Sequence, residues 1–224
     1  MEKSVSNDFK ELYKLYYDKA EYEMNEIRSD IKGCNLCFPE NSKIKVFGSG
    51  HPMADLFIVK STFTKREGDS NIAFFGKSGN AIKKSCEKLN YDYSNLYGTD
   101  VVKCFVSEEI RERCFKNCSK FLKLEILTCQ PKLILSIGEL ATRALDIIKM
   151  EEDEEIEFLP GNIFNFWLEI KVLVTNDLVK SFYDLKAKRQ LWNDIQKFFK
   201  MAKKIETPKT IKENNLLEFA FFIY

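Results

Sequence analysis

Short apolar runs alternate with longer amphipathic segments along this chain. Leu56–Val59 and Leu133–Ile137 are nearly continuous apolar runs, which are typical of strands buried on both faces of a sheet. Residues 96–102, 162–166 and 171–175 are further strand candidates, the last two as a hairpin or as two short strands. Helical periodicity or composition predicts helices over residues 8–31, 80–89, 110–129, 138–150 and 184–204. Helices between buried strands predict an α/β fold, a three-layer sandwich around a central parallel sheet.

This topology also predicts where a ligand should bind. In open parallel sheets, ligands bind beyond the carboxyl ends of the strands. The relevant loops here follow Val59, Thr99 and Val174. The first of them, residues 61–79, is polar and contains glycine, so we expect a loop there. The acidic run Glu151–Glu157 is expected to be a solvated loop.

Composition narrows the class of protein. The 224 residues suit one α/β domain with terminal additions, and 45% hydrophobic with 31% charged residues is ordinary for soluble globular proteins. The net charge of +1 means that any DNA-binding face must be a local patch. The N-terminus has no apolar secretion segment, and no run approaches the roughly 18 apolar residues of a membrane helix. We therefore expect a soluble, intracellular, cytoplasmic protein.

Seven cysteines in a chain without a secretion signal make a disulfide framework unexpected. Cys34-x-x-Cys37 places two thiolates on one side of a tight turn, where both can bind one metal centre. Zinc and iron–sulfur clusters both accept thiolates, although zinc ribbons usually supply a second close pair. Spacing does not choose between Cys114 and Cys118, which lie four apart on one predicted helix face, and two incidental thiols remain an alternative. Cys86 and Cys129 are expected in the core.

Several segments follow one another in a recognisable order. After the Cys34 pair come Gly48-Ser-Gly-His-Pro-Met-Ala-Asp-Leu56, Phe74-Phe-Gly-Lys-Ser-Gly79, Thr99-Asp-Val-Val-Lys-Cys104 and Pro131-Lys-Leu-Ile-Leu-Ser-Ile-Gly138. In order and spacing these segments resemble the family 4 uracil-DNA glycosylases, from Cys34 to about Met150 and more weakly as far as Trp192. The resemblance implies an α/β sandwich with a 4Fe-4S cluster on Cys34, Cys37, Cys104 and Cys118, and it leaves Cys114 out.

The resemblance also implies a division of the chain. An N-terminal helical segment (residues 1–33) precedes a glycosylase-like domain with the iron–sulfur site (residues 34–204). A tail of uncertain structure (residues 205–224) follows, and it contains the apolar stretch Leu216–Tyr224.

The positions that match the family's catalytic residues are substituted. The family's G-E-A-P-G loop corresponds to Lys60-Ser-Thr-Phe-Thr64, so its carboxylate becomes Ser61. Its asparagine in T-N-V-V-K-C, which reads the uracil edge, becomes Asp100, and its late histidine becomes Asp177. The stacking phenylalanine is retained as Phe74. An ionised carboxylate only accepts hydrogen bonds and would repel a departing uracil anion, so these changes argue against ordinary uracil excision.

Two functional hypotheses follow from these substitutions. In the first, the chain is a DNA-binding or structural module with weak or lost glycosylase activity. In the second, the pocket has changed its base specificity: Asp100 accepts from the exocyclic amine of a cytosine- or adenine-like base, and Ser61 positions water. A protein-interaction role is a third alternative, with Leu216–Tyr224 as its first candidate contact surface.

Basic residues are expected around the predicted pocket. Lys60, Lys65, Arg66 and Lys77 lie in loops that would ring it, and Lys180, Lys186, Lys188 and Arg189 lie near its other rim. Phosphate contacts with single- or double-stranded DNA require such charge beside a base pocket. The alternative is that these are solvated side chains on a lysine-rich protein. Phe63 and Phe74 could stack on bases, although core packing is the simpler interpretation of Phe63.

Overall fold

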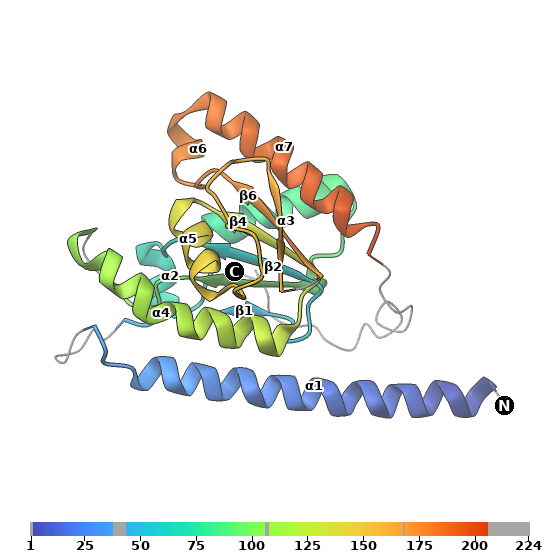
Figure 1. Ribbon diagram of the computed structural model, residues 1–224. Helices are drawn as coiled ribbons and strands as arrows, with labels where there is room; N and C mark the ends of the chain where they lie inside the picture. The colour runs from blue at the N-terminus through green and yellow to red at the C-terminus, as the bar shows by residue number, and fades with distance from the viewer. Residues whose placement is uncertain (1, 38–43, 106–107, 168, 206–224) are drawn as a thin grey trace.

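Parallel strands form the centre of the sheet in the computed structural model (Figure 1). The structure describes residues 2–37, 44–105, 108–167 and 169–205. Within them the strand order is β1-β3-β2-β4-β6-β5, with β1 Ser49–Gly50, β2 Leu56–Lys60, β3 Leu96–Asp100, β4 Leu133–Ile137, β5 Ile163–Phe166 and β6 Ile170–Thr175. The inner four strands run parallel, whereas β1 and β5 pair antiparallel at the edges. The predicted α/β architecture is confirmed, with a mixed sheet rather than a wholly parallel one.

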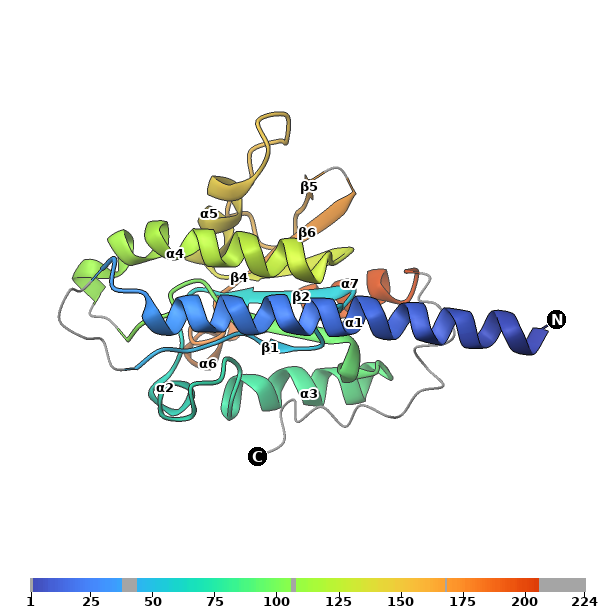
Figure 2. The ribbon, with the colours of Figure 1, turned by 90° about the horizontal axis from the view of Figure 1, so that it is seen from below.

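Helices cover both faces of this sheet (Figure 2). The described helices are α1 Glu2–Gly33, α2 Lys65–Ser70, α3 Lys77–Leu89, α4 Glu108–Cys129, α5 Glu139–Ile148, α6 Lys180–Tyr183 and α7 Leu185–Ala202. Helices α4 and α5 lie on one face, and α3 and α7 on the other. The five predicted helices are present. The short helices α2 and α6 were not predicted, and α2 lies inside the segment expected to be a polar loop.

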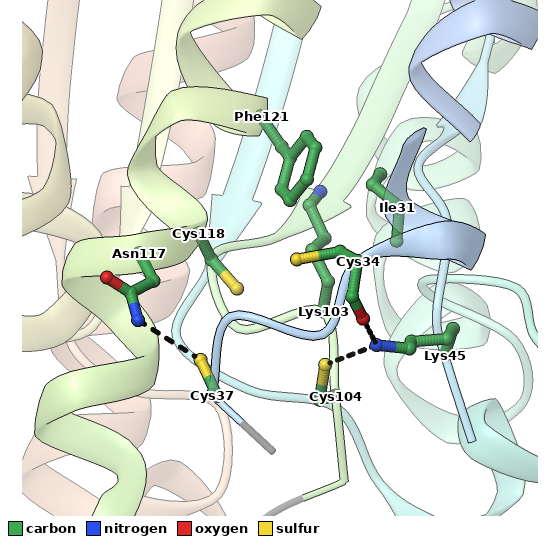
Figure 3. Close-up of a pocket in the computed structure, with 9 residues that line it drawn as sticks. All are labelled: Ile31, Cys34, Cys37, Lys45, Lys103, Cys104, Asn117, Cys118 and Phe121. Carbon is green, nitrogen blue, oxygen red and sulfur yellow. Dashed lines mark hydrogen bonds between the residues drawn. The ribbon is translucent and has the colours of Figure 1, made fainter. Parts of the chain in front are cut away.

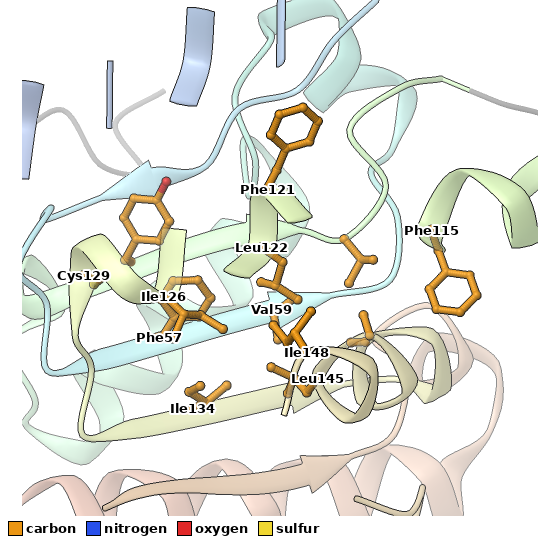
Figure 4. Close-up of a cluster of buried hydrophobic side chains, with 14 of the residues drawn as sticks. Phe57, Val59, Phe115, Phe121, Leu122, Ile126, Cys129, Ile134, Leu145 and Ile148 are labelled. Carbon is orange, nitrogen blue, oxygen red and sulfur yellow. The ribbon is translucent and has the colours of Figure 1, made fainter. Parts of the chain in front are cut away.

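The central strands bury side chains on both faces, which explains their continuous apolar sequence. In β2, Phe57 and Val59 pack with α4 and α5, whereas Leu56 and Ile58 pack with α3 and α7. Figure 4 shows the first of these two clusters, between the sheet and α4 and α5. Burying each such side chain stabilises the fold by about 1.5–3 kcal/mol.

Helix α1 is confirmed as a helix, and it packs against the domain with one face only. Leu12, Leu15, Tyr16 and Tyr22 are exposed, and the side chains that meet the domain are Tyr17, Ala20, Met24, Ile27 and Ile31. Both sets recur at helical spacing, so periodicity alone did not distinguish them. The N-terminal part of α1 projects beyond the sheet (Figures 1 and 2). None of the described helices is both long and apolar enough to span a membrane.

The strand register brings several loops to one edge of the sheet. Lys60 at the end of β2 pairs with Asp100 of β3 and Ile137 of β4, and Ile137 pairs with Thr175 of β6. The segments that begin at residues 61, 101, 138 and 176 therefore start side by side at the carboxyl ends of the strands. The stretch Leu216–Tyr224 lies outside the described residues.

Candidate cluster site and base site

Four cysteine side chains from three parts of the chain line one small cavity. Cys34 and Cys37 follow α1, Cys104 follows β3, and Cys118 belongs to α4. Figure 3 shows their sulfur atoms pointing toward a common space. The other described lining residues are Ile31, Lys45, Lys103, Asn117 and Phe121, none of which carries a carboxylate or an imidazole. Cys114 is fully buried beside Cys37 but is absent from the lining.

Polar side chains around this cavity donate hydrogen bonds to the cysteines and their carbonyl groups. Lys45 Nζ donates to Cys104 Sγ over 3.2 Å and to the Cys34 carbonyl over 2.6 Å. Asn117 Nδ2 lies 3.4 Å from Cys37 Sγ, and Arg113 donates to the Cys37 carbonyl over 3.0 Å. Lys45 thus joins the Cys34 segment to Cys104, and Arg113 and Asn117 join α4 to Cys37.

Burial favours the thiol form of two of these cysteines, Cys104 and Cys118. It raises the pKa of Cys118 to about 12, and it raises the pKa of Cys104 against the opposing effect of Lys45. Among the described residues, no three Cys, His, Asp or Glu side chains converge closely enough to hold a single metal ion. Cys86 and Cys129 are buried in the core, as predicted.

A buried ion pair joins two of the cysteine-bearing segments. Lys103, next to Cys104, places its ammonium 2.8 Å from Glu125 of α4, and both side chains are about 1% exposed. Thr99 and Tyr97 of β3 also donate to the Glu125 carboxylate. This network fixes the end of β3 against α4.

A second buried ion network lies at the carboxyl ends of the strands. Lys60 Nζ donates to Asp100 Oδ1, to Glu67 over 3.2 Å and to the Thr62 carbonyl over 3.0 Å. Asp100 and Glu67 have no exposed surface, and Lys60 is 5% exposed. Burial raises the pKa of Asp100 to about 6, although the Lys60 ammonium opposes this rise. Lys60 was expected on a DNA-binding rim, and its burial in this network corrects that expectation.

Glu67 is held by its own local structure. Its carboxylate accepts from the backbone N–H of Thr64 over 2.7 Å and from Ser78 Oγ over 2.8 Å. Thr64 caps α2 in return, so the pair forms a capping box. The sequence pattern Thr64-x-x-Glu67 was the available signal for this helix, and the sequence analysis missed it.

Phe74 lies directly beside the Lys60 ammonium. Lys60 Nζ is 5.1 Å from the Phe74 ring centre, a cation–π distance. Phe74 is fully buried in a left-handed backbone conformation with φ of 62°. Its ring packs on Gly98 of β3, where a Cβ atom would lie 2.7 Å from the ring, so only glycine permits this approach.

The other two substituted positions converge nearby. A Cβ atom on Gly138 would lie 2.9 Å from Ser61 Oγ and 3.0 Å from Asp177 Oδ2, so both side chains meet over this glycine. Asp177 also accepts from the Val179 N–H over 2.6 Å. The structure therefore brings Ser61 and Asp177 together at the strand ends, as the topology predicted.

His51 does not supply an imidazole to this site. Its Nδ1 accepts from the Met53 N–H over 3.1 Å, and its Nε2 lies 3.1 Å from the Tyr13 hydroxyl on α1. It precedes β2, at the opposite end of the strand from Ser61. Burial lowers the pKa of His51 to about 4, so the ring is neutral at pH 7.

The remaining basic residues are exposed near the strand ends. Lys65 and Arg66 begin α2 and Lys77 begins α3; the Arg66 side chain packs on Gly76 and over the Phe75 ring. Lys180, Lys186, Lys188 and Arg189 are exposed on α6 and α7. Phe63, half-buried, packs against the second core cluster and Phe105. Phe182 and Tyr183 of α6 are exposed beside Lys180, a feature the sequence analysis missed.

This chain is similar to known proteins over most of its length. The family model for the uracil DNA glycosylase superfamily matches residues 47–199. A type-4 uracil-DNA glycosylase of Sulfurisphaera tokodaii is 23% identical over 190 residues, which cover 80% of this chain and 84% of the relative. The match includes β2, β3, β4 and β6 and therefore the whole edge at which Lys60, Asp100 and Asp177 lie.

Proposed function

Because the chain belongs to the uracil DNA glycosylase superfamily, we propose that it is a DNA-binding iron–sulfur protein that excises uracil weakly or not at all. The observation that carries this proposal is the position of the Lys60 ammonium. It lies against Phe74 and is bonded to Asp100, and these two positions match the family's stacking and base-reading residues.

Lys60 occupies the space that a flipped base would need. An ammonium has three N–H donors, and Thr62, Glu67 and Asp100 accept all three. A base that stacks on Phe74 has to displace this group. Removing one partner from a buried ion pair typically costs about 3–5 kcal/mol, which a base would have to recover by its own contacts.

Charge repulsion is the weaker reason for low activity. Lys60 offsets the charge of Asp100, so the repulsion expected from Asp100 alone is reduced. Ser61 still lacks the carboxylate, and Asp177 the imidazole, that the family is expected to have at these two positions. Loss of one donor to a developing anion typically lowers the rate by about a hundredfold to a thousandfold.

Purified protein tests this proposal on single- and double-stranded oligonucleotides that contain one uracil. We expect, at most, trace excision under single-turnover conditions. Robust excision that is lost in Asp177→Ala, and retained in the exposed matched control Asp30→Ala on α1, would refute the proposal.

One observation favours changed base specificity as a second candidate. Asp100 Oδ2 is buried without a hydrogen-bond partner among the described residues. A carboxylate oxygen can accept from an exocyclic amine, as in cytosine- or adenine-like bases. A screen over uracil, hypoxanthine, xanthine and other deaminated or alkylated bases separates the two candidates, because only a changed specificity yields excision of a base other than uracil.

The cofactor is part of the same proposal. Four cysteine sulfur atoms line the cavity, and its other described lining residues supply no carboxylate or imidazole, a donor set that suits an iron–sulfur cluster. A cluster of four irons and four sulfides holds its ligands farther apart than one zinc ion does. Cys34, Cys37, Cys104 and Cys118 would bind the cluster and so tie the turn after α1 to the segment between β3 and α4.

Elemental analysis tests the cofactor. Anaerobically purified protein should be brown and contain iron and acid-labile sulfide in equal amounts. Cys104→Ala should lose both and fold poorly, whereas Cys86→Ala, a buried cysteine outside the cavity, should keep both. Zinc without sulfide would contradict the assignment.

A further inference from the structure

We propose that Lys45 is a positioning residue for the iron–sulfur cluster, a cationic donor to the Cys104 sulfur that raises the cluster's reduction potential. This inference rests on the proposed cofactor. It does not depend on any glycosylase activity.

The backbone fixes Lys45 beside its target. Lys45 and Cys104 form an isolated antiparallel bridge, and the neighbouring Val46 N–H donates to the Lys103 carbonyl over 2.9 Å. From this paired backbone position, the Lys45 side chain reaches the Cys104 sulfur. Its position is therefore set by main-chain pairing as well as by the side-chain contact.

The ammonium joins two of the proposed ligand segments. Its 3.2 Å contact with Cys104 Sγ and its 2.6 Å contact with the Cys34 carbonyl lie on one side of the cavity (Figure 3). Cys34 and Cys104 are 70 positions apart in the sequence, and Lys45 lies between them. The same group can thus orient the Cys104 sulfur and hold the Cys34 turn close to it.

The second ammonium in the cavity wall is engaged differently. Lys103 is bonded to Glu125 and Thr99, so its charge is balanced inside the protein. Asn117 donates to Cys37 Sγ over a longer 3.4 Å and carries no charge. Among the described residues, the cationic side chain that donates a hydrogen bond to a cavity sulfur is therefore that of Lys45.

A donor of this kind should favour the reduced cluster. Reduction adds negative charge to the cluster and its thiolates, and an adjacent cation stabilises the more negative state more strongly. Charge-assisted hydrogen bonds are also stronger than neutral ones. Loss of Lys45 should therefore shift the equilibrium toward the oxidised cluster.

Redox titration of the cluster-loaded protein tests the proposal. The variants are Lys45→Met, of similar length without charge, Lys45→Gln, a neutral donor, and Lys45→Arg, which keeps the cation. Lys84→Met, an exposed position on α3, is the matched control. We expect Lys45→Met to lower the reduced-to-oxidised ratio at a fixed potential about tenfold, or about 59 mV for one electron. Lys45→Gln should shift it less, and Lys45→Arg and Lys84→Met should resemble the unmodified protein.

Iron and sulfide contents separate the possible failures. A fully loaded Lys45→Met protein with an unchanged potential overturns the role of Lys45 and leaves the cofactor proposal intact. Unmodified protein without iron and sulfide overturns the cofactor proposal and this inference with it. If Lys45→Met fails to retain the cluster, retention in Lys45→Arg supports the positioning role, and equal loss in Lys45→Arg overturns it.

Discussion

At the residue scale, the charges of Lys60 and Asp100 offset each other. The two residues are register partners at the ends of neighbouring strands, so their side chains leave the sheet at the same level. A carboxylate at position 100 alone would be buried without a counter-ion, at a cost of several kcal/mol. Lys60 supplies that counter-ion, and Glu67 supplies a second acceptor for it. Lys60, Asp100 and Glu67 therefore form an internally paired network at the strand ends, and on the proposed function Lys60 would occupy the place of a base.

The buried pair between Lys103 and Glu125 should matter far more for stability than an exposed pair. We expect Lys103→Met to lower the free energy of unfolding by about 3–5 kcal/mol, because it leaves Glu125 buried and unpaired. Lys132→Met removes an ion pair to Asp55 in which the lysine side chain is 51% exposed, and it should cost less than about 1 kcal/mol. Urea unfolding of both variants measures the difference. Similar losses would show that burial does not govern these pairs.

His51 should make the protein sensitive to mild acid. Its folded pKa of about 4 lies below the ordinary value of 6.5, so between these pH values the unfolded chain binds a proton that the folded chain excludes. Stability is therefore unaffected by His51 above pH 6.5 and falls as the pH drops toward 4, by roughly 3 kcal/mol in total. His51→Gln should remove this part of the pH dependence in urea unfolding at a series of pH values. Parallel curves for the two proteins would contradict the assignment.

At the element scale, the strands and helices that follow from hydrophobic periodicity could be predicted from the sequence. Features that depend on one or two side-chain contacts could not. Strands β2 and β4 were predictable because burial on both faces leaves a continuous apolar run. Helix α2 was not predictable from apolar pattern, because it is six residues long and held by the Thr64–Glu67 capping box. The set Cys34, Cys37, Cys104 and Cys118 came from the family resemblance, because spacing alone did not choose between Cys114 and Cys118. The burial of Lys60 was missed because it depends on Asp100, 40 positions away in the sequence, and on Glu67, which no motif singled out.

Helix α1 allows a direct test of which face packs. Ile27 is 6% exposed and packs in the core cluster, so Ile27→Ala should cost about 2–5 kcal/mol. Leu15 is 66% exposed, so Leu15→Ala should change stability by less than about 1 kcal/mol. Thermal or urea unfolding compares the two variants. A larger loss in Leu15→Ala would mean that the exposed stripe is covered in solution.

At the scale of the whole molecule, a group of exposed basic residues and part of the acidic run lie at opposite ends of the sheet. Lys65, Arg66 and Lys77 follow the carboxyl end of β2. Part of the acidic run lies at the other end, where Asp153 accepts from the Trp167 N–H over 3.0 Å, just before β6 begins. On the proposed function, a phosphate backbone at this end of the sheet would meet the positive charge of Lys65, Arg66 and Lys77.

DNA binding should depend on this rim and on salt. Each phosphate neutralised releases counterions, so the logarithm of the binding constant falls linearly with the logarithm of salt concentration. Lys65 and Arg66 are exposed, so Lys65→Ala/Arg66→Ala should weaken binding to all sequences about equally. It should also flatten the slope by roughly 2 for duplex DNA, since each phosphate contact contributes about 0.9.

The matched control is Lys10→Ala/Lys14→Ala, which removes two exposed lysines from α1, away from the strand ends. Fluorescence anisotropy on single- and double-stranded DNA at several salt concentrations measures affinity and slope together. Because Lys60 is buried and paired, its removal should leave the slope unchanged even if it alters the base site. Absent binding at low salt, or equal effects of the two double variants, would exclude this rim as the DNA contact and favour a protein-interaction role for the chain.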